Sequence, residues 1–556
     1  MEAQDEPEEH AVVRPGRQPA LVVAVVFTAA AVVQQILPAV GVGGPLPGWQ
    51  PLPFLLVAAP AWLLARPWAT AGRKPPYVLS WLVVRLRHVP SWALPAAVLA
   101  AAAVVWAALQ DQEPYLGHEE AVYANKARSW LDGTPDAGWG TYRPIGLPVL
   151  GRLALGLSDT VGAVRAVALV LALFTLTVTY VVAARWTTPR RAAVAALLML
   201  GGLGFLRRIP EFLNDIGSTG LLLIVVYLLT RAQEKPSSRA LLWVPPVALA
   251  AFYLRYGVAG NLVAIAIAAV AAYGPRAWLE QRGRLAVAAA VFLAGLVPHF
   301  VYATKVAGWP LGLIFSATSH ANRAYVGDGF VYYLGIFPYR LAGDLGAVVM
   351  AAGLYAAGAA FRRRLSTGTE GRTARRKVFL GSTAVLVVVL LGMATDGEPR
   401  FIYLSVVLLT ILGVQAIADL TGRWSAHVLT AVALLAAITV PATAMSVARG
   451  AMPAPNAERD STVPVAEQLA SDGPCLLVTG YEPEMGWYSG CDAITYAQAA
   501  ETDFPAGTRV SFVLFRHGRL QPGAAALRDL IDGHSVTTRT IRTTGSLGTA
   551  TVITLR

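Results

Sequence analysis

Charged residues are scarce in this chain, and their scarcity excludes most soluble folds. Asp, Glu, Lys and Arg account for 14% of the 556 residues, whereas soluble domains carry about 25%. Hydrophobic residues account for 55%, and they recur in runs of about 20, the length that crosses a bilayer. The composition therefore predicts a polytopic α-helical membrane protein with room for one smaller soluble domain.

Nucleotide and metal signatures are also missing. The chain has no P-loop and no glycine-rich fingerprint that follows a strand, so a nucleotide sugar is not the expected ligand. Its eight histidines are scattered, and His118-Glu119-Glu120 lacks the second His that a metalloprotease helix places four residues after the first. We predict no metal site and no required cofactor; a divalent cation held by an acidic pair is the alternative.

The excess of basic residues does not indicate a nucleic-acid partner. The net charge is +12, but most Lys and Arg fall in short links between apolar runs, where they act as topology signals and contact anionic lipids. The N-terminal stretch is acidic and then basic, without the apolar core of a cleavable signal peptide. We expect an integral plasma membrane protein that binds no nucleic acid.

Thirteen apolar runs predict 11 to 13 membrane spans, because prolines interrupt the first two. The runs lie near residues 20–40, 52–66, 91–109, 161–184, 190–206, 213–230, 240–255, 257–273, 285–303, 341–360, 378–394, 401–418 and 426–447. The stretch 75–89 sets Trp81 and Leu82 among arginines and predicts an amphipathic segment at the bilayer surface.

Basic residues fall in every second link between these spans. The basic links lie near residues 66–87, 185–191, 231–239, 276–284 and 362–377. The positive-inside rule assigns them, with the N-terminus, to the cytoplasm. The opposite side then receives Glu119, Glu120, Glu211, Asp215 and the segment 396–400, together with the C-terminal region.

The C-terminal region changes character. Apolar runs of strand length at 475–480, 509–515, 535–541 and 549–555 alternate with amphipathic helical patterns at 463–470 and 524–531. They predict a small extracytoplasmic α/β domain. Its cysteines, Cys475 and Cys491, form a disulfide if the domain faces an oxidising compartment, and two buried thiols are the alternative.

The chain thus divides into three parts. Residues 1–90 hold the cytoplasmic N-terminus, two spans and the interfacial segment. Residues 91–450 form the main transmembrane domain, with an outer loop at 110–160, and we expect residues 451–556 to form the extracytoplasmic domain.

The outer loop contains several acidic, aromatic and basic side chains of the kinds found in active sites. Glu119 and Glu120 open a short helical pattern, and Tyr123, Tyr142 and Arg143 follow. A carboxylate partly shielded from water suits a general base, and guanidinium groups suit phosphate because their planar fork pairs with two oxygens. The alternative is a pair of surface carboxylates favoured by the helix dipole.

Several motifs resemble GT-C glycosyltransferases. EEAVYA at 119–124 and YRPIGLPVL at 142–150 are similar to the first outer loop of the family that includes protein O-mannosyltransferases and the aminoarabinose transferase of lipid A. Asp215 in LNDIGSTGLLLI and Arg400 in EPRFIYLSVVLL match that family's second acidic position and late arginine. The chain departs from the pattern in having Glu-Glu where Asp-Glu is commoner, and Ile145 in place of a second proline.

The resemblance covers about residues 91–450 and implies an inverting glycosyltransferase. Its donor is expected to be a polyprenyl-phosphate sugar, and its acceptor a cell-envelope glycan, a lipid or a protein on the outer face. The catalytic candidates are Glu119 as the base, Glu120 and Asp215. The candidates for the donor phosphate are Arg255, Arg400, Arg208 and Lys305, with Arg207, Arg323 and Arg340 also considered. The candidates for substrate contact are Tyr123, Tyr142, Arg143, Glu211 and Glu398.

Two other functions stay open. A transporter or flippase of lipid-linked sugars is the chief alternative, and a non-catalytic scaffold is another. Transporters place charges near the bilayer midplane and often contain inverted repeats, whereas most acidic residues before the C-terminal region lie at span ends. That distribution favours the enzyme, although Asp215 could be a helix cap and an arginine could extend to the interface.

Overall fold

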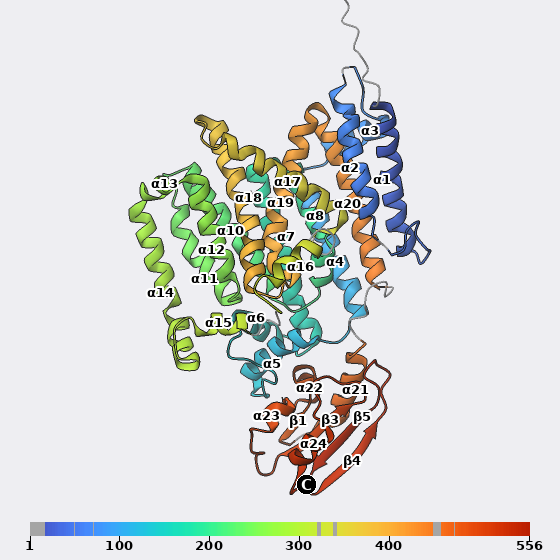
Figure 1. Cartoon of the computed structure of the whole chain (residues 1–556), viewed down its shortest axis with the longest axis vertical. Coiled ribbons are helices and arrows are strands. Elements are labelled where there is room, and N and C mark those ends of the chain that lie inside the picture. The colour runs from blue at the N-terminus through green and yellow to red at the C-terminus, as the bar shows by residue number, and fades with distance from the viewer. Residues whose placement is uncertain are drawn as a thin grey trace, which may run out of the picture.

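A computed structural model describes residues 17–556 apart from Trp49, Ala71, 320–323, 337–341, 449–456 and Asp472. A bundle of long apolar helices carries, at one end, a small domain of mixed helix and strand (Figure 1). This arrangement confirms the predicted fold class, a polytopic α-helical membrane protein with a C-terminal α/β region.

The helices of the membrane region follow the predicted order. They are α1 (Arg17–Ala39), α2 (Leu52–Ala65), η1 (Pro67–Ala69), α3 (Tyr77–His88), α4 (Ala93–Gln112), α5 (His118–Asp132), α6 (Gly146–Leu155), α7 (Val161–Trp186), α8 (Pro189–Leu200), α9 (Leu203–Arg208), α10 (Asp215–Glu234), α11 (Ala240–Leu254), α12 (Val258–Tyr273), α13 (Pro275–Leu279), α14 (Arg282–Ala307), α15 (Gly312–Ser319), α16 (Asp328–Ile336), α17 (Gly343–Arg363), α18 (Gly368–Ala394), η3 (Pro399–Ile402), α19 (Tyr403–Thr421), η4 (Gly422–Trp424) and α20 (Ser425–Ala448).

Each predicted span contains a helix, because a helix satisfies its own backbone hydrogen bonds in lipid. Within the described residues, nine helical segments are long and apolar enough to cross a membrane, and one of these contains both α19 and α20. One prediction was wrong in detail: the run near 190–206 is divided into α8 and α9 at Gly201 and Gly202. Glycine has a poor helix propensity, and here two occur in succession.

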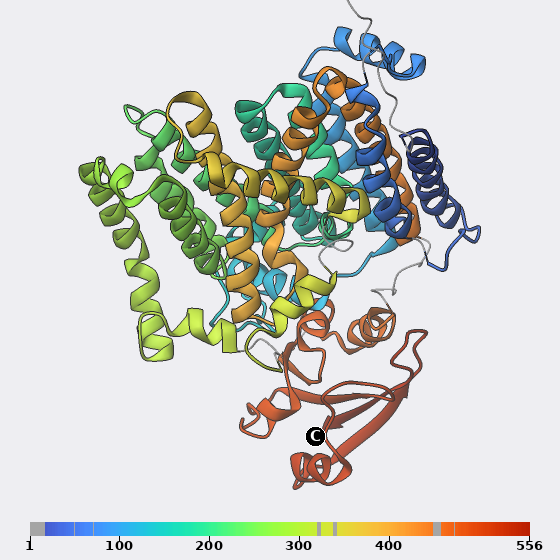
Figure 2. The ribbon, with the colours of Figure 1, turned by 45° about the horizontal axis from the view of Figure 1, so that its top comes forward.

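The predicted interfacial segment is also helical. It forms α3, which lies across the ends of the spans rather than among them (Figure 2). Its last turn carries Arg85, Arg87 and His88. Basic side chains at this position match a helix that lies at the bilayer surface.

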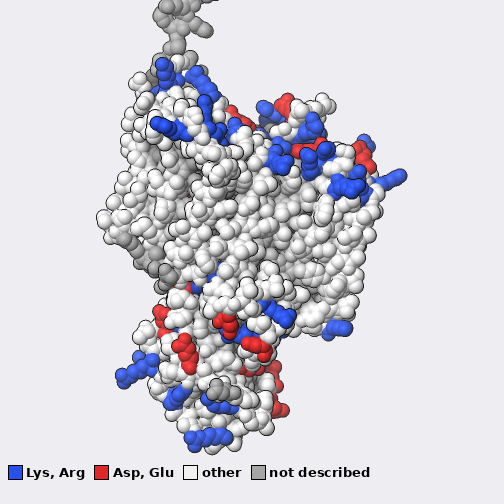
Figure 3. Space-filling model, turned by 180° about the vertical axis from the view of Figure 1, so that it is seen from behind, with Lys and Arg blue, Asp and Glu red and all other residues white. Residues whose placement is uncertain are grey.

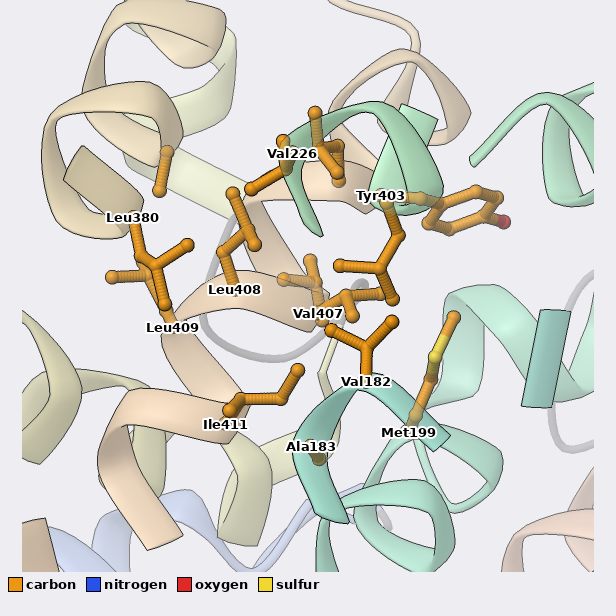
Figure 4. Packing of buried hydrophobic residues seen from close by; sticks show 14 of the residues in the cluster. Val182, Ala183, Met199, Val226, Leu380, Tyr403, Val407, Leu408, Leu409 and Ile411 are labelled. Atoms are coloured by element: carbon orange, nitrogen blue, oxygen red, sulfur yellow. The ribbon is translucent and has the colours of Figure 1, made fainter. Parts of the chain in front are cut away.

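α19 is a central helix of the core. Its residues Tyr403, Val407 and Leu408 are buried and pack against side chains of α8, α10 and α18 (Figure 4). Gly413 lets α19 approach α17 closely, because a Cβ there would collide with the Val349 carbonyl oxygen. Close backbone approach at small residues is a common way to join helices in membranes. The core therefore holds α10 and α19 in fixed positions beneath the outer loop.

On the face that Figure 3 shows, the charged residues lie at the two ends of the molecule. Lys and Arg gather at the end of the bundle away from the C-terminal domain, and a belt without charge separates that end from the domain (Figure 3). Such a belt is the surface expected of a multi-pass membrane protein. The positive-inside rule assigns the basic end to the cytoplasm, and this orientation stays a prediction.

The C-terminal domain contains one mixed sheet. Its strands are β1 (Cys475–Val478), β2 (Asp492–Ile494), β3 (Arg509–Phe515), β4 (Val536–Ile541) and β5 (Ala550–Leu555), and its helices are α21 (Arg459–Leu469), α22 (Glu482–Ser489), α23 (Tyr496–Ala499) and α24 (Ala524–Ile531). The strand order is β2-β1-β3-β5-β4; β1 is parallel to β2 and β3, and β5 is antiparallel to β3 and β4.

The four predicted strands and both predicted helices of this domain are present, whereas the short β2, α22 and α23 were not predicted. Cys475, in β1, and Cys491, just before β2, form a disulfide. The disulfide thereby ties the two ends of the α22 segment together.

The domain docks on the outer loop through α22. Asn125 of α5 donates hydrogen bonds to the carbonyl oxygens of Ala137 and Pro483, and the Arg128 guanidinium lies 3.3 Å from the centre of the Trp487 ring. These contacts attach the soluble domain to α5, the helix that carries Glu119 and Glu120.

Candidate active site

The first turn of α5 carries both adjacent carboxylates. Glu119 and Glu120 lie near the helix N-terminus, where the dipole and free N–H groups stabilise negative charge. Successive residues on a helix with 3.6 residues per turn point about 100° apart. The two side chains therefore meet different surroundings, and they have different partners.

Glu120 points into the protein. Its side chain is 3% exposed and is paired with Arg165 of α7, which is itself 1% exposed, at 3.1 Å. The two carboxylate oxygens also accept hydrogen bonds from the backbone N–H groups of Gly117 and Phe212, each at 2.8 Å. Glu120 thus joins the start of α5 to α7 and to the segment before α10, and it lies away from solvent.

Glu119 keeps its side chain 40% exposed. Its Oε2 accepts a hydrogen bond from Arg143 at 2.6 Å, and its Oε1 accepts a longer one from the same guanidinium at 3.4 Å. Burial raises the pKa of Glu119, but Arg143, with Arg400 and His118 nearby, outweighs burial and lowers the pKa to about 2. Glu119 is therefore ionised at neutral pH, and its exposed side can accept a ligand's hydrogen bond.

Asp215 holds two arginines at the start of α10. It is 4% exposed and forms an ion pair with Arg255, in the short turn between α11 and α12. A guanidinium nitrogen of Arg400, in η3, lies 3.9 Å from its other oxygen. The guanidinium groups of Arg255 and Arg400 lie 4.3 Å and 5.8 Å from the centre of the Phe401 ring. One carboxylate and one aromatic ring therefore fix both cations.

Tyr123 connects the two carboxylate sites. Its ring is buried, the Arg143 guanidinium lies 5.5 Å from the ring centre, and its hydroxyl accepts a hydrogen bond from Asn214 at 3.3 Å. Burial raises the pKa of Tyr123, Arg143 opposes this rise, and Glu119 and Asp215 add to it. Glu119 and Asp215, which are distant in the chain, therefore act on the same phenol.

Two guanidinium groups of this cluster keep free donors. The Nε–H groups of Arg143 and Arg400 are buried and donate no hydrogen bond within the part of the chain that the structure describes. Glu398 lies 3.5 Å from the Nε of Arg400, as an ion pair without hydrogen-bond geometry. Buried donors of this kind suit an anionic ligand with several oxygens.

Comparison with known proteins identifies the fold. A family model of dolichyl-phosphate-mannose-protein mannosyltransferases matches residues 143–302. A crystal structure of ArnT from Cupriavidus metallidurans bound to undecaprenyl phosphate aligns with a TM-score of 0.59 at 15% identity, over 82% of this chain and 97% of that chain. Its apo form, over the same shares at 15% identity, gives a TM-score of 0.61. The apo oligosaccharyltransferase of Archaeoglobus fulgidus gives 0.50 at 12% identity, over 82% and 74% of the two chains. No curated protein sequence matches this chain.

The chain has a GT-C fold. The fold and the family match confirm the prediction of a membrane glycosyltransferase of this class. The matched segment includes Arg143, Asp215 and Arg255, whereas Glu119 and Arg400 lie outside it. Glu119 and Arg400 join the cluster through their contacts with Arg143 and Asp215.

Other predicted residues surround this GT-C cluster. Arg208, the last residue of α9, pairs with Glu211, three residues later in the following turn. The Glu211 carboxylate raises the pKa of Arg208, and burial opposes this. The Arg143 guanidinium lies 5.4 Å from the centre of the Tyr142 ring. Arg208 and Glu211 thus lie just before Asp215 in the chain, and Tyr142 contacts Arg143, the partner of Glu119.

Lys305 does not join the cluster. It is exposed near the end of α14 and pairs with no carboxylate among the described residues. An ammonium group is strongly hydrated, which favours such an exposed position. Arg323 and Arg340 lie outside the described residues.

Two residues that contact the cluster, Arg165 and Phe401, were not predicted. Arg165 lies within the apolar run that forms α7, and a charge in such a run usually has a buried partner. That signal was available in the sequence, although it does not identify Glu120 as the partner. Phe401 had no comparable signal, because it is one aromatic residue among many.

Metal ligands are not grouped in the described structure. No cluster of three or more His, Cys, Asp or Glu side chains there could hold a metal ion. The absence of a metal requirement stays a prediction.

Proposed function

We propose that this protein transfers a sugar from a polyprenyl-phosphate donor to a hydroxyl acceptor, with inversion at the anomeric carbon. One observation carries the proposal: Tyr123 connects a half-exposed carboxylate with two arginines. Glu119 pairs with Arg143, which lies near the Tyr123 ring. The Tyr123 hydroxyl accepts a hydrogen bond from Asn214, which directly precedes Asp215, the residue that holds Arg255 and Arg400. The ArnT structure of the same fold contains undecaprenyl phosphate, which supports a donor of that chemical class.

Arg255 and Arg400 bind the departing phosphate in this scheme. The bond between the anomeric carbon and the phosphate oxygen breaks, and its electron pair leaves with the phosphate. Guanidinium groups already in place stabilise this charge without moving. Asp215 is then a positioning residue, because its contacts are with the arginines.

Glu119 receives the proton of the acceptor hydroxyl. The hydroxyl oxygen attacks the anomeric carbon on the face opposite the phosphate, and a single displacement of this kind inverts the configuration. A carboxylate with a pKa of about 2 is a weak base, so proton transfer occurs late, when the new bond has made the hydroxyl acidic. A donor phosphate that draws Arg143 towards itself would raise the pKa of Glu119 and assist this step.

The acceptor meets Glu119 from its exposed side. We infer that this side is extracytoplasmic, since the basic end of the bundle lies away from it (Figure 3). The acceptor is then a cell-envelope glycan, a lipid or a secreted protein. The C-terminal domain braces α5 on the same side through Asn125 and Arg128, and the scheme requires no metal ion.

Transfer by purified variants tests the proposal. Glu119→Gln and Asp215→Asn should each reduce transfer from a polyprenyl-phosphate sugar by about 10²-fold or more. Asp132→Asn, at the exposed end of the same helix, is the matched control and should retain activity. Full activity in both site variants would exclude the site. Movement of a lipid-linked sugar across proteoliposomes without transfer would instead support a flippase.

A further inference from the structure

An apolar cavity lies at the basic end of the bundle, outside the candidate active site. It has a volume of about 690 Å³ and is lined by α3, α4, α8 and α20. Its walls are mainly apolar, with Val98, Val105, Leu197 and Leu429 among the lining residues. Cavities of this size and lining are typical of sites for apolar ligands.

The cavity runs from the basic end into the hydrocarbon core. Its lining residues run from Leu94 to Val105 on α4 and from Ser425 to Pro441 on α20, which span about 16 Å and about 24 Å at 1.5 Å per residue. A hydrocarbon core is about 30 Å thick. The cavity thus begins at the level of the basic links and extends to mid-bilayer or beyond, a depth that accommodates an acyl chain of a phospholipid.

The open end of the cavity is positively charged. Arg87, Arg190 and Arg191 line it, and none of the three pairs with a carboxylate among the described residues. Arg190 donates to the carbonyl oxygen of Arg87 at 3.0 Å and so fixes α3 against α8. The described lining contains no Asp or Glu.

Two helix N-termini open at the same end. Thr188 caps α8, with its hydroxyl accepting a hydrogen bond from the Arg191 backbone N–H, and α20 begins at Ser425. Both residues line the cavity. Helix N-termini favour anions, and they add here to the uncompensated arginines. Charge and shape therefore select a ligand with an anionic head and an apolar tail.

We propose that this cavity binds an anionic phospholipid of the leaflet at the basic end, with an acyl chain between α4, α8 and α20 and its phosphate at Arg87 and Arg191. Basic pockets between membrane helices on the cytoplasmic side hold anionic headgroups elsewhere. A long polyprenyl chain fits less well, because it would extend beyond the cavity. The bound lipid fastens α3, the surface helix, to the bundle.

Native mass spectrometry of the whole protein tests this site. Phosphatidylglycerol and phosphatidylcholine with identical acyl chains are titrated separately, and phosphatidylglycerol should bind more tightly. Arg87→Ala/Arg191→Ala should weaken phosphatidylglycerol binding by about tenfold or more and leave phosphatidylcholine unchanged. Arg276→Ala/Arg282→Ala is the control, because it removes the same charge from exposed positions at the same end and should have little effect.

A second variant tests the apolar part of the cavity. Ala97 lines the cavity and Ala100, on the same helix, does not. Ala97→Phe should reduce phosphatidylglycerol binding, and Ala100→Phe should not; thermal melts confirm that both are folded. The proposal is overturned if the two phospholipids bind equally well, or if both double arginine variants lose the same amount of phosphatidylglycerol binding. Either result would mean that the lipid binds only non-specifically around the bundle. Stronger binding of undecaprenyl phosphate at this site, or a co-purifying membrane subunit that blocks it, would also overturn the proposal.

Discussion

The neighbouring carboxylates of α5 should respond in opposite ways to the same substitution. Glu120 is buried against Arg165, so Glu120→Gln leaves a buried guanidinium without its counter-ion. Breaking a buried ion pair by removing one partner costs about 3–5 kcal/mol. We therefore expect Glu120→Gln to lower stability strongly, with any loss of activity following the loss of folded protein.

Glu119→Gln should give the reverse result. The Glu119 side chain is 40% exposed, and water screens its pairing with Arg143, so stability should change little. The lowered pKa of Glu119 means that its stabilising effect is present above the ordinary carboxylate pKa and is lost only as pH falls towards about 2. Between pH 6 and 8 its contribution is constant, while transfer should fall by about 10²–10⁴-fold.

Three measurements decide between these expectations. Thermal unfolding in detergent and limited proteolysis of the outer loop report stability, and transfer per folded molecule reports chemistry. A Glu120→Gln/Arg165→Met double variant should recover part of the lost stability, because it removes both charges. The reasoning is refuted if Glu120→Gln unfolds like the wild type, or if Glu119→Gln is equally destabilised.

Three further outcomes follow from particular contacts. Arg400→Lys keeps the charge but loses the planar fork, so kcat/KM for the donor should fall at least about tenfold, and unchanged kinetics would contradict its role at the phosphate. Replacing Cys475 and Cys491 by Ser should destabilise the C-terminal domain by about 3 kcal/mol, as for a closed loop of about 15 residues, measured by melts with and without reductant. Burial lowers the pKa of His118, but Glu484 outweighs this and raises it. The ion pair of protonated His118 with Glu484 therefore stabilises the docked domain fully below the unfolded-state pKa of about 6.5. This stabilisation is lost as pH rises through the higher pKa that His118 has in the folded protein. The protection factors of the α22 amides, which correct for the intrinsic rise of exchange with pH, should therefore fall from pH 6 to pH 8.5, and His118→Gln should remove that fall.

The membrane architecture could be predicted because its signals are local. Apolar runs and basic links locate the spans, and apolar runs of strand length locate β1, β3, β4 and β5. The separation of α8 from α9 was missed, although Gly201 and Gly202 are visible in the sequence. The missed β2 has only three residues, too few for an alternating pattern to develop.

The partners of the charged residues could be predicted only in part. The family motifs pointed to Glu119, Asp215 and Arg400, and Arg255 was a further candidate for the donor phosphate. In the structure Glu119 pairs with Arg143, which lies near the Tyr123 ring. Asp215 pairs with Arg255 and Arg400, which lie near the Phe401 ring. The motif favoured Glu119 as the base, but it could not show that Glu120 is buried, since that depends on how α5 is rotated against α7. That rotation is set by Arg165, which is distant in the chain.

The buried ion pairs also help to distinguish a glycosyltransferase from a transporter. A transporter that alternates access must move one group of helices against another around its site. Here Asp215 joins α10 to the turn after α11 and to η3, while Glu120 joins α5 to α7. Sliding these helices apart would expose buried charges or leave them without a partner, each at a cost of several kcal/mol. An enzyme that holds a phosphate and a hydroxyl in one geometry gains from the same rigidity, because catalysis depends on groups already in position.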